Sequence, residues 1–249
     1  MKLPYFKSAT QWHNEHMDGE MRVAVVVLAA GSGSRFGHST NKVWLPLSGR
    51  RILSRSLTNA VKSFPKSRNV LVINPTDSHL AKEVLSREAH SIKVEIVAGG
   101  NSRHESEHNA LMHLAPAIEA GKINVVMIHD GARPLATSKL FLDIAQAAHL
   151  HGGAIPAIVV DPREIDYSSD REIVRVQTPQ AFRAKDLLDA YRSAEVDGFV
   201  GTDTAACMEE YFPKVHTIAV PGEVANVKIT YPQDLVIAEH VLEMRGYKE

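Results

Sequence analysis

Short apolar segments alternate with longer amphipathic segments from Arg22 onward, and this alternation constrains the fold more than any other feature of the sequence. Several apolar segments are nearly continuous runs of Val and Ile, which is typical of parallel strands buried on both faces. The alternation predicts a three-layer α/β/α sandwich around a mostly parallel sheet. The predicted strands are Val23–Leu28, Val70–Ile73, Val94–Val97, Val125–Ile128, Ala154–Val160 and Val215–Val220.

The segments between these strands repeat their apolar residues with helical spacing. Ser102 with Glu105, and Thr230 with Gln233, have the spacing of capping boxes at helix starts. In a Rossmann-like sheet of this kind, ligands bind at the carboxyl ends of the strands. The predicted helices are Ile52–Phe64, His79–Ala89, Ser102–Glu119, Ser138–Leu150, Ala184–Ser193, Asp203–Tyr211 and Pro232–Arg245.

One domain over residues 21–249 is predicted, because no repeat or low-complexity tract interrupts the alternation. The first twenty residues are polar and lack the apolar centre of a signal peptide, so we expect a loose tail over residues 1–20. The clearest irregular insertion is the Pro-, Asp- and Ser-containing stretch 161–170.

Charge and composition exclude several classes of protein. The 28 basic and 29 acidic residues give a formal charge of −1, which argues against a nucleic-acid surface or a polybasic membrane signal. The longest apolar run, residues 23–30, is far below the roughly 20 residues of a membrane span. The single Cys207 excludes an internal disulfide and a Cys-cluster zinc site, which predicts a reducing compartment such as the cytoplasm.

A loop rich in Gly and Ser follows the first predicted strand and contains Arg35, with Lys42 shortly after it. Small residues allow a close approach of the backbone to a ligand, and successive N–H groups can bind an anion. A Walker loop is excluded because His38 follows Gly37, and a dinucleotide fingerprint is excluded because Asn74 follows the second strand. A polyphosphate site, or a plain tight turn with two solvated cations, both fit this segment.

Five segments of the sequence carry recognisable motifs, and they are Leu28–Arg35 with Lys42, Ile128–Pro134, Gln177–Phe182, Thr202–Ala205, and Asn226–Thr230 with Asp234–Leu235. Together they resemble the 2-C-methyl-D-erythritol 4-phosphate cytidylyltransferase family of sugar-phosphate nucleotidyltransferases. The resemblance covers residues 23–239 and implies the nucleotide-diphospho-sugar transferase fold. It also implies transfer of CMP from CTP to a polyol phosphate, release of pyrophosphate, a role in non-mevalonate isoprenoid synthesis, a Mg²⁺ ion and a homodimer.

The resemblance assigns the catalytic roles to four cations. It places Arg35 and Lys42 on the triphosphate, Lys228 on the acceptor phosphate, and Arg171 on the substrate from the arm. Lys228 lies in the apolar segment Val227–Ile229, interpreted as a strand, where a charge needs a partner. Asn41 stands where the family usually has Pro, and we expect it to loosen the loop that carries Lys42.

The nucleotide and substrate contacts follow from the same resemblance. Asp130 would hold Mg²⁺ or the ribose, and one carboxylate can suffice for Mg²⁺. The residues implied in substrate binding are Gly131, Arg133 and Thr202; a salt bridge for Arg133 and a helix N-cap for Thr202 stay open as alternatives. The residues implied in nucleotide binding are Ala29, Ala30, Gly31, Gly100, Asn101, Arg103, Ser106 and Asp130.

Histidines do not form a metal site in this interpretation. His129 is interpreted as packed beside the site, and His104 with His108 as an exposed helical face without a third ligand.

The stretch after the fifth predicted strand departs most from the family. Pro162 stands where the family has a substrate-contacting Thr, and the arm over residues 161–176 is several residues shorter than usual. We expect a truncated arm and a smaller dimer interface, with Arg171 as the arm arginine and Arg175 as the competing choice. Ribitol 5-phosphate as acceptor, and a non-catalytic nucleotide-binding relative, are the alternative functions.

Overall fold

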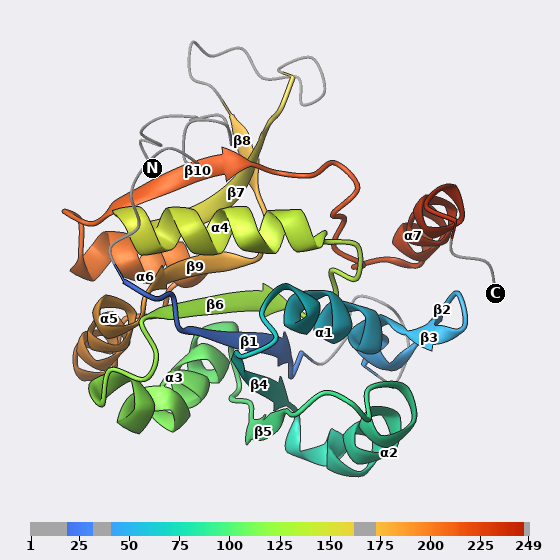
Figure 1. Ribbon diagram of the computed structural model, residues 1–249, viewed down its shortest axis with the longest axis horizontal. Coiled ribbons are helices and arrows are strands. Elements are labelled where there is room, and N and C mark those ends of the chain that lie inside the picture. The colour runs from blue at the N-terminus through green and yellow to red at the C-terminus, as the bar shows by residue number, and fades with distance from the viewer. Residues whose placement is uncertain (1–18, 32–40, 162–172, 247–249) are drawn as a thin grey trace.

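The computed structural model describes residues 19–31, 41–161 and 173–246, and is built around an eight-stranded sheet (Figure 1). The strand order is β10-β7-β9-β6-β1-β4-β5, and β8 pairs with β7. Only the pairs made by β8 and β9 are antiparallel, so the predicted mostly parallel sheet is confirmed. The strands are β1 Val23–Ala29, β4 Arg68–Ile73, β5 Glu95–Ala98, β6 Val125–Asp130, β7 Gly152–Val159, β8 Val174–Val176, β9 Gln180–Arg183 and β10 His216–Pro221.

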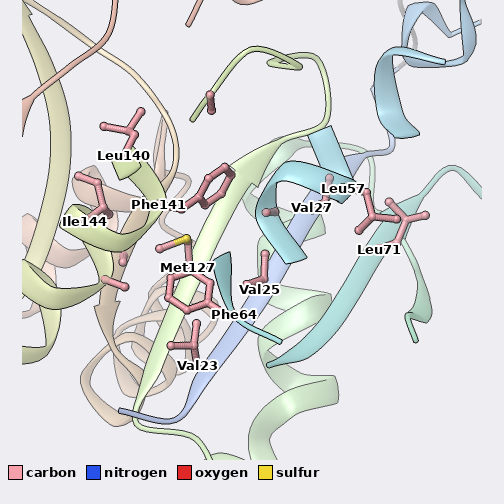
Figure 2. Packing of buried hydrophobic residues seen from close by; sticks show 14 of the residues in the cluster. Val23, Val25, Val27, Leu57, Phe64, Leu71, Met127, Leu140, Phe141 and Ile144 are labelled. Carbon is pink, nitrogen blue, oxygen red and sulfur yellow. The ribbon is translucent and has the colours of Figure 1, made fainter. Parts of the chain in front are cut away.

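Helices cover both faces of the sheet. Val23, Val25 and Val27 of β1 point into a core formed with α1, α2 and α4 (Figure 2), whereas Ala24 and Val26 point into a core formed with α3, α5 and α6. This alternation along one buried strand confirms the predicted three layers. The helices are α1 Ile52–Ser63, α2 Ser78–Glu88, α3 Arg103–Glu119, α4 Ser138–His151, α5 Ala184–Asp197, α6 Thr204–Tyr211 and α7 Pro232–Met244.

A smaller apolar cluster extends the fold beyond the end of the sheet. Ala238 and Leu242 of α7 pack there with Leu47 of a short hairpin. That hairpin joins β2 (Pro46–Leu47) and β3 (Arg50–Arg51). None of the helices in the described ranges is long and apolar enough to cross a membrane.

Several details differ from the sequence-based expectations. Strands β8 and β9 and the short hairpin of β2 and β3 were not predicted, although β9 lies between β6 and β7 in the middle of the sheet. The segment Val227–Ile229 is not a strand; a single backbone hydrogen bond, from the Ile229 N–H to the Ala132 carbonyl, ties it to the chain after β6. The cap of α7 lies one residue later than predicted, because the Asp234 carboxylate accepts from the N–H groups of Thr230 and Tyr231.

Candidate active site

A cavity of about 590 Å³ opens at the carboxyl ends of β1, β4 and β6. A second cavity of about 600 Å³ lies near the amino end of β6, beside Asn124 and Arg183, and none of the predicted site residues lines it. All residues implied in nucleotide binding and the catalytic residues Lys42 and Lys228 meet in the first cavity. Those lining it are Ala29, Ala30, Gly31, Lys42, Gly100, Asn101, Arg103, Ser106, Asp130 and Lys228, together with Leu28, Asn41, Val43, Asn74, Ser102 and Ala132.

The end of β1 and the short helix η3 (Lys42–Trp44) form one wall of the cavity. Asn41 is buried, and its Nδ2 atom donates to the Ala29 carbonyl at 2.7 Å while its Oδ1 atom accepts from the Val43 N–H at 3.3 Å. The expected loosening is therefore wrong, because this amide ties the Lys42 segment to β1. Arg35 lies outside the described residues.

The loop before α3 forms the facing wall. A Cβ atom at Gly99 would lie 2.2 Å from the Cβ atom of Ala30, so only glycine allows these two walls to meet. Ser102 caps α3 by accepting from the Glu105 N–H, and the Glu105 carboxylate accepts from the Asn101 N–H.

Ser106 holds this loop from inside. Its hydroxyl donates to the Ser102 carbonyl at 2.9 Å and accepts from the Gly100 N–H at 3.1 Å. Because the hydroxyl proton is engaged within the protein, Ser106 can meet a ligand only as an acceptor.

Asp130, the last residue of β6, is surrounded by three cations. Its Oδ1 atom pairs with Nη1 of Arg103, and its Oδ2 atom lies 2.9 Å from Nζ of Lys228 and 3.5 Å from Nε of Arg133. Burial alone would raise the pKa of the Asp130 carboxyl, but the three cations hold that pKa well below its usual range. Asp130 is therefore ionised at neutral pH, and it fixes the three cations against one another.

Arg133 forms the salt bridge left open by the sequence. Its side chain is largely buried, does not line the cavity, and donates from Nη1 to the Asn226 carbonyl at 2.7 Å. Asn226, which is fully buried, in turn donates to the Thr178 carbonyl at 2.9 Å. These bonds position the extended segment that carries Lys228.

The two other residues implied in substrate binding do not line the cavity. Both backbone groups of Gly131 are used within the protein, since its N–H donates to Leu28 and its carbonyl accepts from Ser56. Thr202 is exposed, and the N-cap of α6 is Asp203, which accepts from the Ala206 N–H at 2.9 Å.

His129 is packed beside the site, as predicted, with no exposed surface. Its ring stacks edge-on against Phe141, and Nε2 lies 3.2 Å from the Arg133 carbonyl oxygen. Burial lowers the pKa of His129 to about 4, so its imidazole is neutral at physiological pH.

Glu107 was missed by sequence reasoning. It is 1 % exposed, and Arg103 places Nε 2.9 Å from its Oε1 atom while Tyr191 and Thr204 donate hydroxyl protons to it. Burial raises the pKa of Glu107, and the charge of Arg103 opposes that rise. The expected exposed face at His104 is also wrong, because its ring is buried and stacks on Tyr191 at 4.7 Å.

The donor set of the cavity limits how Mg²⁺ could bind. Asp130 is the only carboxylate among the described lining residues, and these ranges hold no group of three or more His, Cys, Asp or Glu side chains placed for a metal. Both carboxylate oxygen atoms of Asp130 already form ion pairs, Oδ1 with Arg103 and Oδ2 with Lys228. The residues therefore fit a Mg²⁺ ion held mainly by ligand phosphates and water, with Asp130 as one protein ligand at most.

The arm lies largely outside the described residues, and so do Pro162 and Arg171. Arg175 belongs to β8, opposite Ile158 of β7, and does not line the cavity.

Comparisons with known proteins identify the family of the chain. A family model for 2-C-methyl-D-erythritol 4-phosphate cytidylyltransferase matches residues 23–244. Curated relatives of that name include one from Aquifex aeolicus, 37% identical with 87% of this chain and 96% of that protein covered, and one from Bacillus mycoides, 33% identical with 89% and 98% covered. A solved 4-diphosphocytidyl-2C-methyl-D-erythritol synthase from Anaerococcus prevotii superposes with a TM-score of 0.74, at 25% identity over 90% of this chain and 96% of that one. The chain therefore belongs to the 2-C-methyl-D-erythritol 4-phosphate cytidylyltransferase family, a family of nucleotidyltransferase enzymes.

Proposed function

We propose that this chain transfers CMP from CTP to 2-C-methyl-D-erythritol 4-phosphate and releases pyrophosphate, as a step of isoprenoid precursor synthesis. The observation that carries the proposal is one cavity lined by Lys42, Arg103 and Lys228, of which Arg103 and Lys228 pair with Asp130. A family member that keeps this cationic cavity has the charge needed for a reaction between two phosphates.

Charge stabilisation and alignment are the tasks of this site. The nucleophile is a phosphate oxygen that is already anionic at neutral pH, so the reaction needs no general base. Lys42, with Arg35, stabilises the crowded α-phosphate and the leaving pyrophosphate, while Lys228 orients the acceptor phosphate. His129 serves as packing, since it is buried and does not line the cavity.

The nucleotide occupies the side of the cavity built on β1 and on the loop before α3. Backbone groups of Ala29, Ala30 and Gly31 contact the nucleotide phosphates and sugar, and the loop of Gly100, Asn101 and Ser106 reads the base. Arg103 and Asp130 lie between the two substrates. When bound, Mg²⁺ neutralises part of the triphosphate charge and polarises the α-phosphate.

Assembly and location belong to the same proposal. We expect a homodimer in which the arm of one subunit reaches the site of its partner, and a cytoplasmic enzyme, because the single Cys207 is buried and reduced.

Pyrophosphate release with purified protein tests the function. CTP, Mg²⁺ and 2-C-methyl-D-erythritol 4-phosphate should give turnover, whereas ribitol 5-phosphate should give a much lower kcat/KM. ATP, GTP and UTP should each be poorer than CTP, and EDTA should abolish turnover. Faster reaction with ribitol 5-phosphate would change the acceptor, comparable kcat/KM for UTP would remove the base-reading assignment, and no turnover with either acceptor would favour a non-catalytic relative.

A further inference from the structure

A fully buried carboxylate, that of Glu107, lies directly behind the cavity. It belongs to the first turns of α3 and lies among the apolar residues that α3, α5 and α6 pack against the sheet. An ionised group in such a core is costly unless donors compensate it. Two hydroxyl groups donate hydrogen bonds to Glu107, those of Tyr191 of α5 and Thr204 of α6, and Arg103 of its own helix forms an ion pair with it.

The two hydroxyl groups contact only the carboxylate, whereas Arg103 also reaches the cavity. Arg103 forms ion pairs with two carboxylates through different nitrogen atoms: Nε lies 2.9 Å from Glu107, and Nη1 pairs with Asp130. A single ion pair would leave the guanidinium able to rotate about its contact with Asp130. Two pairs on different nitrogen atoms remove that freedom.

We propose that Glu107 is a positioning residue, which holds Arg103 in the orientation that fixes Asp130 and its other cations for the reaction. The proposal rests on the function proposed above. The hydroxyl groups of Tyr191 and Thr204 offset the burial of the Glu107 carboxylate, whereas the ion pair with Arg103 is the contact that reaches the cavity. Glu107 itself does not line the cavity and touches no substrate.

Removal of the Glu107 charge has two opposite effects on the site. Loss of the second contact lets Arg103 move, which disturbs the alignment of the reacting groups. Loss of a negative charge near the cavity favours binding of the triphosphate. The first effect acts mainly on kcat, and the second acts on CTP affinity. If Glu107 acts by positioning Arg103, the first effect dominates, and we expect a lower kcat with little change in the CTP dissociation constant.

The test compares Glu107→Gln with Tyr191→Phe, which removes a donor from the same carboxylate and keeps the ion pair with Arg103. Glu107→Gln should lower kcat by about tenfold or more, since small misplacements of reacting groups cost rates of this order. The CTP dissociation constant, measured by calorimetry, should change by less than about threefold. Tyr191→Phe should keep kcat within about twofold, with the folded fraction of each variant measured by circular dichroism at the assay temperature.

A second comparison separates positioning from stability. In an Arg103→Gln background, Glu107→Gln should lower kcat by less than about a further twofold, because its effect passes through Arg103. Glu107→Met, which places an apolar side chain of similar length in the same core, must show the same dependence on Arg103 and serves if the Gln variant does not fold.

Equal kcat for the Glu107 and Tyr191 variants at matched folded fractions, or independent losses in the Arg103→Gln background, would overturn the positioning role. Absence of turnover by the unmodified enzyme would instead refute the proposed function.

Discussion

The position of Lys42 at the cavity is set by the hydrogen bonds of its neighbour Asn41. The Asn41 amide ties η3 to the end of β1, so Lys42 lines the same cavity as Ala29, Ala30 and Gly31. A cation that acts on developing charge contributes most in the transition state. Lys42→Ala should therefore lower kcat by about 100-fold, with a much smaller change in KM for CTP. Lys139→Ala, which removes an exposed lysine on α4, is the control, and near-normal kcat in Lys42→Ala would refute the catalytic role.

Lys228 has a different expected effect, because it is positioned from the acceptor side. In the structure it pairs with Asp130, which keeps Arg103 and Arg133 as partners when Lys228 is removed. Lys228→Ala should raise KM for the acceptor phosphate by about tenfold or more and leave the CTP dissociation constant nearly unchanged. Calorimetry and steady-state kinetics measure the two quantities, with the exposed Lys214→Ala as control. Lost CTP binding in a folded variant would assign Lys228 to the nucleotide.

For individual residues, the sequence predicts which side chains line the site better than it predicts which partners those side chains contact. The cavity gathers every residue implied in nucleotide binding together with Lys42 and Lys228, but not Gly131, Arg133 or Thr202. Glu107 was missed and His104 was misjudged because both contact Tyr191 of α5, more than 80 positions along the chain, and no local sequence pattern indicates such a contact. Asn41 was misjudged because the carbonyl that it binds belongs to another element.

Strands β4 and β5 and helix α3 are joined by one charged cluster at the sheet edge. Arg68 donates two bonds of 2.7 Å to Glu95, and Nε2 of His113 lies 2.7 Å from the same carboxylate. The Arg68 guanidinium is the main cause that lowers the pKa of Glu95 from 4.5 to about 2. Since the folded-state pKa lies below the unfolded one, this stabilisation is present above pH 4.5 and is lost as pH falls toward 2.

Glu95→Gln should therefore be less stable than the unmodified protein at neutral pH, by a small amount because the cluster is partly exposed. The difference in urea midpoint should shrink as the pH falls from about 4.5 to about 2. Glu119→Gln, which removes an exposed ion-pair partner elsewhere on α3, is the control. A difference that stays constant over this range would contradict the proposed cause.

The helices and strands can be predicted from the sequence where their apolar pattern extends over enough residues. Strands β1, β4, β6 and β7 and all seven described helices fall close to their predicted ranges. Strand β9 was not predicted because Gln180–Arg183 has only four residues, begins with a polar residue and shows no alternation of apolar and polar residues. Its place is decided by pairing with β6 and β7, which a local pattern does not encode.

In the expected homodimer, each active site depends on both subunits. If the arm of one subunit completes the site of its partner, homodimers of Arg171→Ala and of Lys228→Ala should both have low activity. Dimers that combine one subunit of each variant should regain part of the activity, because one of their two sites is intact. Arg175→Ala, in β8, is the matched control and should behave as the unmodified enzyme. Sedimentation velocity reports the dimer. Mixtures without regained activity, or an acceptor KM raised only in Arg175→Ala, would move the role away from Arg171.

The three cations around Asp130 come from positions 103, 133 and 228, and this spacing has a consequence for biosynthesis. When β6 emerges from the ribosome, Arg103 has already emerged and Arg133 follows at once. The buried aspartate can therefore be neutralised while β1, β4, β5 and β6 associate, long before Lys228 is translated. A nascent chain can thus build the nucleotide half of its cavity first and receive the acceptor lysine last.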